Sequence, residues 1–305
     1  MRRVSALALG WLLLPASVSP ALAQLSPSAT WAAHAANDYQ VVPNVTYLVA
    51  SNFESKLDVY QRRGATTPQP TVVYFHGGFW AAGAKESSLM SLIPWMEMGW
   101  NVVNVEYRLA RVAPAPAAVE DGLCALRFLA VQAKTYNIDP SRLVVTGESA
   151  GGHLTLTSAM IPESAGLDRQ CANIGTAVPK VAAAINWFGI TDVADVIDGP
   201  HRANLAVTWL GGLPNRDEIA KRVSPLTYVR SDLPPILTIH GDKDPLVPYD
   251  HALRLHAALT KAGVQNQLLT VPNGAHGNFT AEERTNAFAT IREFLTAHGL
   301  PAANP

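Results

Sequence analysis

Ser149 stands at the centre of a pentapeptide that reads G-E-S-A-G, from Gly147 to Gly151, which follows the strand-like run Leu143–Thr146. This spacing is typical of a sharp turn between a strand and a helix, in which small neighbours leave room for a strained serine. Such a turn presents the serine hydroxyl beyond the end of the strand. The same pattern also occurs in ordinary glycine- and serine-rich turns, so the rest of the chain has to distinguish the two interpretations.

A serine hydroxyl is a poor nucleophile at neutral pH, so it needs a base within hydrogen-bond reach and a further group that orients this base. Histidine suits the role of base because its pKa lies near neutrality. We predict His276, in a glycine-flanked loop after the last expected strand, as the base and Asp244 as the acid that orients it. Asp242 is the alternative acid, and Asp192 is a more remote candidate.

Three further histidines lie at or beside the expected strand ends and have other expected roles. His76 opens the sequence HGGFW and is expected to brace that loop. His153, in the first turn of the helix expected after Ser149, is expected to have a structural role. His240 comes at the end of an expected strand, where it is a candidate to support the catalytic residues. These interpretations leave His276 as the predicted base.

Acyl transfer places negative charge on the carbonyl oxygen of the substrate, and backbone N–H groups that already point at this oxygen stabilise it. Gly77 and Gly78 can supply such donors, because a residue without a side chain lets the backbone approach a substrate closely. The amide of Ala150, directly after the serine, is predicted as a further donor. The amide of Phe79 is an alternative in the first loop, and a simple tight turn is the alternative for the loop as a whole.

Four short apolar runs directly precede the loops that carry these residues. They are typical of strands buried on both faces, and segments with a helical spacing of apolar residues lie between them. The runs are Val72–Phe75, Leu143–Thr146, Ile236–Ile239 and Leu268–Val271. This alternation predicts a mostly parallel central sheet flanked by helices on both faces. Because ligands bind beyond the carboxyl ends of the strands in such sheets, the four loops should meet at one edge.

Three regions depart from this alternation. Residues 24–44 read as an irregular arm. The runs Val45–Val49 and Leu57–Gln61 alternate between apolar and polar residues, which predicts an antiparallel pair of strands. Residues 189–233 lack clear periodicity and are predicted as a small insertion in the sheet domain.

The N-terminus has the features of a secretory signal peptide. Two arginines precede the apolar stretch Val4–Leu14, and Ala21–Ala23 forms a small-x-small cleavage pattern. The stretch is too short to span a bilayer, which argues against the alternative of a membrane anchor. We therefore predict a signal peptide at residues 1–23 and a single mature domain at residues 24–305, which would be periplasmic or secreted.

The composition argues against several functional classes. The chain of 305 residues is 48% hydrophobic and 15% charged, its formal net charge is −1, and it has no basic run that would bind nucleic acid or an anionic membrane. No cluster of histidine, cysteine and aspartate has the spacing of metal ligands, and no cofactor is expected. Export permits a disulfide, and the even cysteine count favours a bond between Cys124 and Cys171 over two buried thiols.

Five motifs together carry a resemblance to a known family. They are HGGFW (76–80), EYRLA (106–110), GESAGG (147–152), HGDKDPLVP (240–248) and GAHGNF (274–279). In this order they resemble the α/β-hydrolases of the carboxylesterase/lipase group, especially the exported acetylxylan- and feruloyl-esterase-like branch, which is itself similar to hormone-sensitive-lipase-type esterases. The resemblance implies an α/β-hydrolase fold and a serine carboxylic-ester hydrolase that uses no cofactor. It implies Ser149 as nucleophile, His276 as base and Asp244 as orienting acid.

The implied substrate is a short-chain acyl or aromatic ester, such as an acetyl or feruloyl ester of plant polysaccharide, because no long apolar lid segment is evident and the chain is predicted to be exported. The side chains of Trp80, Trp187 and Trp209 are candidates for the wall of the substrate site.

Other activities fit the same residues. The loop HGGFW departs from the HGGG form and is similar to the loop of arylformamidases, so an amidohydrolase of that type is the main alternative. A serine peptidase is less favoured, because a peptidase of this fold usually has an extra propeller domain for which the chain has no room. An inactive binding module is also less favoured, because all three triad positions carry competent residues.

Overall fold

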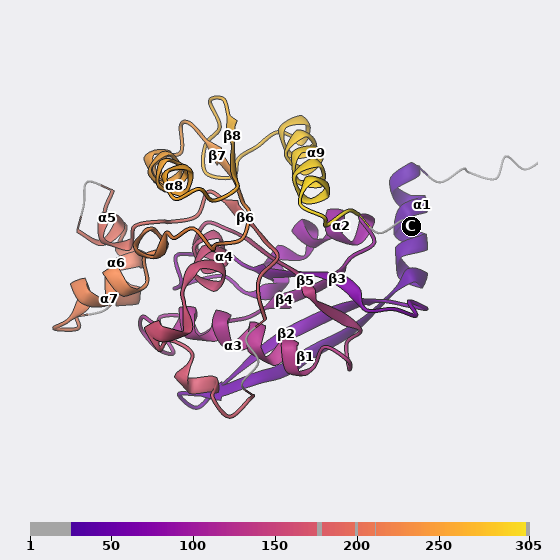
Figure 1. Cartoon of the computed structure of the whole chain (residues 1–305), viewed down its shortest axis with the longest axis horizontal. Coiled ribbons are helices and arrows are strands. Elements are labelled where there is room, and N and C mark those ends of the chain that lie inside the picture. Colours follow the sequence, from indigo (N-terminus) through magenta and orange to yellow (C-terminus); the bar gives the residue numbers. More distant parts are fainter. Residues whose placement is uncertain (1–25, 176–178, 199–200, 211, 303–305) are drawn as a thin grey trace, which may run out of the picture.

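The computed structural model of the chain describes residues 26–175, 179–198, 201–210 and 212–302. The predicted signal peptide, residues 1–23, lies outside the described residues. The residues that are described form one eight-stranded sheet with helices on both of its faces (Figure 1). This is the mostly parallel α/β architecture that the alternation of strands and helices predicts.

The strand order in the sheet is β1-β2-β4-β3-β5-β6-β7-β8. Strand β2 pairs antiparallel with both β1 and β4, and the remaining neighbours pair in parallel. The bounds are β1 (Tyr39–Ala50), β2 (Phe53–Arg62), β3 (Gln69–Phe75), β4 (Asn101–Val105), β5 (Ile138–Glu148), β6 (Ala183–Trp187), β7 (Ile236–Gly241) and β8 (Asn266–Val271). The predicted antiparallel pair corresponds to β1 and β2.

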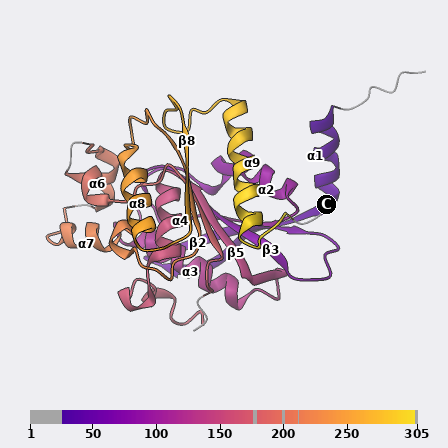
Figure 2. The same cartoon turned by 45° about the horizontal axis from the view of Figure 1, so that its top comes forward.

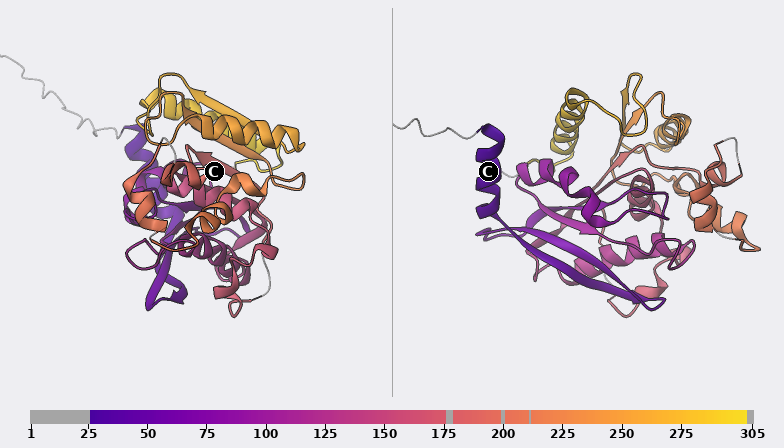
Figure 3. Two further views of the ribbon diagram at one scale, coloured as in Figure 1. Left: turned by 90° about the vertical axis from the view of Figure 1, so that its left-hand side faces the viewer. Right: turned by 180° about the vertical axis from the view of Figure 1, so that it is seen from behind.

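Helices α2 (Leu89–Glu97) and α9 (Ala281–Ala297) cover one face of the sheet, and the other face is covered by α3 (Ala117–Val131), α4 (Ala150–Met160) and α8 (Asp250–Lys261) (Figures 1 and 3). The side chains of β3 pack alternately against the helices on the two faces of the sheet. Val73 and Phe75 belong to the core under α3 and α4, whereas Val72 and Tyr74 belong to the core under α2 and α9. Successive strand residues point to opposite faces, so a strand buried on both faces is apolar at consecutive positions.

The prediction of an irregular arm over residues 24–44 is wrong. Helix α1 spans Pro27–Asp38, and β1 follows it directly. Ser26 caps the helix by accepting a hydrogen bond from the amide of Ala29 at 3.2 Å, and proline at the first helical position fits the start of a helix. None of the described residues of α1 is buried. The helix therefore lacks the apolar stripe by which a sequence reveals a surface helix.

The segment between β6 and β7 contains the predicted insertion. It forms the short helices α5 (Val193–Ile197), α6 (Asn204–Leu210) and α7 (Arg216–Arg222). In Figure 1 these helices lie together at the side of the molecule, next to α4 and α8. Short helices interrupted by turns explain why the sequence shows no single period there.

A buried ion pair fixes the loop after β4. The guanidinium of Arg108 contacts the carboxylate of Asp121 on α3 through Nε and Nη2, at 2.9 and 2.6 Å from Oδ1. The backbone amide of Arg108 donates to Oδ2 of the same carboxylate at 2.7 Å, and Ser55 donates to it at 3.2 Å. Both charged side chains have an exposed fraction of 1% or less. The arginine of the EYRLA motif is thus structural.

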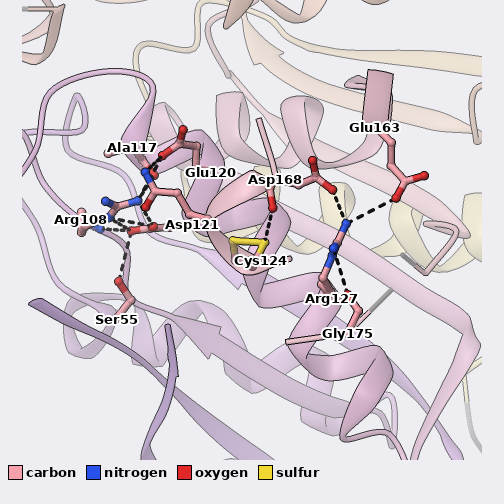
Figure 4. The surroundings of a disulfide bond; sticks show 12 residues. Ser55, Arg108, Ala117, Glu120, Asp121, Cys124, Arg127, Glu163, Asp168 and Gly175 are labelled. Atoms are coloured by element: carbon pink, nitrogen blue, oxygen red, sulfur yellow. Dashed lines mark hydrogen bonds and ion pairs between the residues drawn. A yellow bond between two sulfur atoms is a disulfide. The ribbon is translucent and has the colours of Figure 1, made fainter. Parts of the chain in front are cut away.

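The sulfur atoms of Cys124 and Cys171 are joined in a disulfide bond close to this ion pair (Figure 4). Cys124 lies on α3, three residues after Asp121, and Cys171 lies in a short 3-10 helix that precedes β6. Beside the bond, Arg127 on α3 pairs with Asp168. The disulfide and the Arg127–Asp168 ion pair attach the segment between α4 and β6 to α3.

Asp121→Asn is predicted to destabilise the protein by about 3–5 kcal/mol, because it removes the buried counter-charge of the Arg108 guanidinium and leaves only the more distant carboxylate of Glu120, at 3.4 Å. Urea denaturation of the two proteins measures the difference. Asp217→Asn is the matched control, since the Asp217 side chain is 85% exposed and surface changes of this kind usually stay within about 0.5 kcal/mol. Equal denaturation midpoints for the two variants would contradict the prediction.

Candidate active site

The turn at Ser149 has the geometry that the G-E-S-A-G spacing predicts. Strand β5 ends at Glu148, Ser149 takes φ 58° and ψ −117°, and α4 begins at Ala150. A Cβ atom on either Gly147 or Gly151 would overlap the carbonyl oxygen of Phe75 on β3. Only glycine therefore fits at both positions, and the close contact with β3 holds the serine in a backbone conformation that residues with a side chain rarely adopt.

Three predicted residues meet at the carboxyl edge of the sheet. The Nε2 atom of His276 lies 2.9 Å from Oγ of Ser149, and its Nδ1 atom lies 2.7 Å from Oδ2 of Asp244. They come from loops that follow β5, β7 and β8. The alternative acids have other partners: Asp242 accepts a hydrogen bond from the amide of Asn273, and Asp192 forms an ion pair with Arg254 at 2.9 Å.

The carboxylate of Asp244 is held by several donors. The amides of Leu246 and Val247 donate to its Oδ1 at 2.8 and 2.9 Å, and Nε2 of His240 lies 3.3 Å from its Oδ2. Burial alone would raise the pKa of Asp244, but the hydrogen bonds from His240, His276 and the backbone hold this pKa well below its usual range. The carboxylate is thus ionised at neutral pH and fixes a proton on Nδ1 of His276, which leaves Nε2 free to accept one.

Arg284 connects the loops of the serine and the histidine. Its Nη2 donates a hydrogen bond of 2.7 Å to the carbonyl oxygen of Gly277, the residue that directly follows His276. Its Nη1 lies 3.8 Å from Oε1 of Glu148, the residue before Ser149. Sequence reasoning missed this residue. One signal was present, because Arg284 lies near the N-terminus of α9, where the helix dipole disfavours a positive charge.

The loop that follows β3 is strained and braced. Gly78 takes φ 122°, and Phe79 and Trp80 also have positive φ values of 48° and 57°. His76 stacks on Tyr107 with ring centroids 4.3 Å apart, in the bracing role expected for it, and burial lowers its pKa to about 4. The backbone amides of Gly77 and Gly78 donate no hydrogen bond to the backbone of the part of the chain that the structure describes.

Ala150 is the first residue of α4. The first amides of a helix have no partner within the helix, so the amide of Ala150 is available to an acceptor outside it. The three predicted oxyanion donors, Gly77, Gly78 and Ala150, thus all have amides that the secondary structure does not use.

The prediction that Trp80 and Trp209 contact the substrate is wrong, because both side chains are completely buried. Their rings stack on each other with centroids 4.1 Å apart. The indole N–H of Trp80 donates to Nδ1 of His153 at 3.1 Å, and Nε2 of His153 lies 2.7 Å from the carbonyl oxygen of Val223. Burial lowers the pKa of His153 to about 3, so its ring is neutral. This cluster anchors the HGGFW loop to α4 and to the insertion.

Trp187 differs from the other two tryptophans. Its backbone oxygen accepts a hydrogen bond from the amide of Ser149 at 2.9 Å. Its side chain lines a pocket of about 860 Å³ between α2 and α9, which also includes Glu148 and Arg284. The pocket has a size suited to a small organic ligand. Trp187 thus lines a cavity together with Glu148, the residue that directly precedes Ser149.

The described residues contain neither a candidate metal centre nor a candidate membrane span. No group of three or more histidine, cysteine, aspartate or glutamate side chains among them could hold a metal ion. Within the same residues, no helix combines the length and apolar character needed to cross a membrane.

Comparison with known proteins identifies the family. The family model BD-FAE matches residues 57–259, and the model of TAP-like proteins matches residues 215–305. Carboxylesterase NlhH of Mycobacterium tuberculosis is 30% identical over 230 residues, which cover 73% of this chain and 71% of the relative. The chain belongs to the carboxylesterase group of the α/β-hydrolases.

A further relative and two solved structures are also similar to this chain. Esterase LipQ of Mycobacterium tuberculosis is 28% identical over 257 residues, which cover 81% of this chain but only 58% of LipQ. A truncated carbohydrate esterase from gut microbiota has a similar structure, with a TM-score of 0.70, 27% identity, and coverage of 86% of this chain and 97% of that one. Esterase 2 of Thermogutta terrifontis, with propionate bound, shares the fold with a TM-score of 0.73, 24% identity, and coverage of 88% and 97%.

Gly78→Ala is predicted to lower kcat/KM for an aryl acetate by roughly a hundredfold or more, the effect of losing one oxyanion donor. The added Cβ would overlap the backbone of Ala82, and alanine rarely adopts φ 122°, so the loop has to move. Gly212→Ala is the control, because nothing lies within 4 Å of its added Cβ. Activity within twofold of the wild type in a correctly folded Gly78→Ala protein would refute the prediction.

Proposed function

We propose that this carboxylesterase-group protein is an exported serine hydrolase that cleaves short-chain acyl or aromatic esters. The observation that supports the proposal best is the hydrogen-bonded series Asp244–His276–Ser149, with distances of 2.7 and 2.9 Å. Three loops far apart in the sequence supply these groups, and a serine hydroxyl within reach of an oriented imidazole is what acyl transfer requires.

The proposed reaction begins with attack of Oγ of Ser149 on the acyl carbon, while Nε2 of His276 takes the hydroxyl proton. The carbonyl oxygen becomes negatively charged and accepts hydrogen bonds from amides of Gly77, Gly78 and Ala150. Collapse of this intermediate breaks the ester bond, and the imidazolium of His276 gives its proton to the departing alcohol. An acyl group then remains on Ser149.

Water completes the cycle by the reverse sequence. His276 removes a proton from the water as its oxygen attacks the acyl carbon, and the proton then passes to Oγ of Ser149 as the carboxylic acid leaves. Asp244 stays ionised throughout and stabilises the imidazolium that forms in both halves of the reaction. Every proton is returned, so the chemistry requires no cofactor.

The proposed natural substrates are acetyl or feruloyl esters of plant polysaccharide. Two observations support this choice: the similarity to a carbohydrate esterase from gut microbiota, and the predicted export, which would bring the protein to an extracellular or periplasmic polymer. Export is supported by the signal-peptide pattern at residues 1–23 and by the Cys124–Cys171 disulfide, a bond typical of oxidising compartments.

Hydrolysis of an aryl formamide would use the same triad, so substrate turnover has to separate the two activities. The relatives named esterase or carboxylesterase favour the ester. A suitable panel contains acetyl, butyryl and octanoyl aryl esters, methyl ferulate, acetylated xylan and an aryl formamide. The proposal predicts the highest kcat/KM among the acetyl and feruloyl esters, and a preference for the formamide would contradict it.

Ser149→Ala is predicted to reduce kcat on every hydrolysed substrate by about 10⁴-fold to 10⁶-fold, since the hydroxyl that forms the acyl-enzyme is missing. Ser141→Ala serves as the control, because Ser141 is an exposed residue near the start of β5, at the end of the strand away from Ser149. Circular dichroism establishes that both variants are folded. Ester turnover near the wild-type rate in Ser149→Ala would exclude Ser149 as the nucleophile.

A further inference from the structure

A pocket lies between α2 and α9, and its lining includes none of the three triad residues. It has a volume of about 860 Å³ and lies on the sheet face opposite α3, α4 and α8. Figures 1 and 2 show α2 and α9 side by side on that face. We call this cavity the α2–α9 groove, and its lining includes Glu148, Trp95, Trp187, Phe288 and Arg292.

One end of the groove lies at the catalytic edge of the sheet. Glu148, which lines it, directly precedes Ser149, and Arg284, which also lines it, donates a hydrogen bond to the backbone after His276. The groove then continues down α9 to Arg292, two turns further, which is roughly 12 Å along a helix axis. A molecule bound there would extend away from the serine along the flank of the sheet.

The groove has an aromatic floor and a polar rim. Trp95 and Trp187 are almost completely buried, and the ring of Phe288 packs on them with centroid distances of 6.1 and 5.5 Å. Phe288 itself is only partly buried, so part of this residue is accessible to a ligand. Polar and charged side chains surround this floor, and they are Ser91, Glu97, Glu148, Arg284, Thr285, Arg292 and Glu293.

The charges of the rim nearly balance, because three glutamates face two arginines. A neutral ligand with an apolar face and many hydroxyl groups matches such a surface better than an ion or a long hydrocarbon. The C–H face of a sugar ring packs on an aromatic ring, whose face carries partial negative charge, and its hydroxyl groups hydrogen-bond to charged side chains at the edge.

We propose that the α2–α9 groove binds the sugar residues of an esterified oligosaccharide whose ester group is attacked by Ser149. This inference rests on the proposed function and specifies where the carbohydrate lies. Phe288 provides the stacking surface near the serine, and Arg292 contacts sugar residues of the oligosaccharide that lie further from the ester group.

The test is a binding measurement that does not depend on turnover. Isothermal titration of the Ser149→Ala protein with an acetylated xylotetraose gives the Kd, and Phe288→Ala in the same background is expected to raise this Kd by roughly tenfold. Arg292→Gln is expected to weaken binding of the tetramer but not of an acetylated disaccharide. Leu253→Ala is the control, because Leu253 is 48% exposed on α8, on the other face of the sheet.

The outcomes separate this inference from the proposed function. An unchanged Kd in both groove variants would overturn the sugar site. So would a Ser149→Ala protein that does not bind the tetramer, when the wild-type protein hydrolyses aryl acetates. Both outcomes leave the esterase proposal intact. Binding that depends on Phe288, in a protein that hydrolyses no ester, would support the groove and refute the esterase. A dimer that dissociates on Phe288→Ala, measured by light scattering, would identify the groove as a subunit contact and overturn the proposal.

Discussion

The site depends on the contact between the turn at Ser149 and the end of β3. The carbonyl oxygen of Phe75 lies only 2.4 and 2.0 Å from the positions that a Cβ would take on Gly147 and Gly151. This contact draws the start of α4 onto the sheet and forces Ser149 into its positive φ. The proposed roles of His276 and Asp244 depend on this fixed position of the serine hydroxyl, which lies within reach of the loop that follows β8.

Around this turn, each neighbouring loop is attached by a contact outside the triad. The buried stack of Trp80 and Trp209, with the hydrogen bond to His153, attaches the HGGFW loop to α4 and the insertion. Arg284 attaches the loop of His276 to the end of β5. Since preorganised groups need no rearrangement during the reaction, these attachments are part of what a serine hydrolase requires.

Much of this arrangement could be predicted from the sequence, for physical reasons. Strands buried on both faces are continuous apolar runs, and the loops after them collect at one edge, so the meeting of Ser149, Asp244 and His276 follows from their positions after β5, β7 and β8. The rest could not be predicted. Helix α1 buries no described residue and has no apolar stripe. The aromatic type of Trp80 and Trp209 does not distinguish a core stack from a ligand wall, and Arg284 acts through contacts with residues distant in sequence.

The central claim is that Ser149, activated by His276, is the nucleophile. The most direct measurement is mass spectrometry of the intact and digested protein after incubation with an aryl phosphonate ester, whose adduct resembles the tetrahedral intermediate. The account predicts one phosphonyl group per chain, on the peptide that contains Ser149, and a much slower reaction in His276→Ala. An adduct on another residue, or labelling of Ser149 at the same rate without His276, would contradict it.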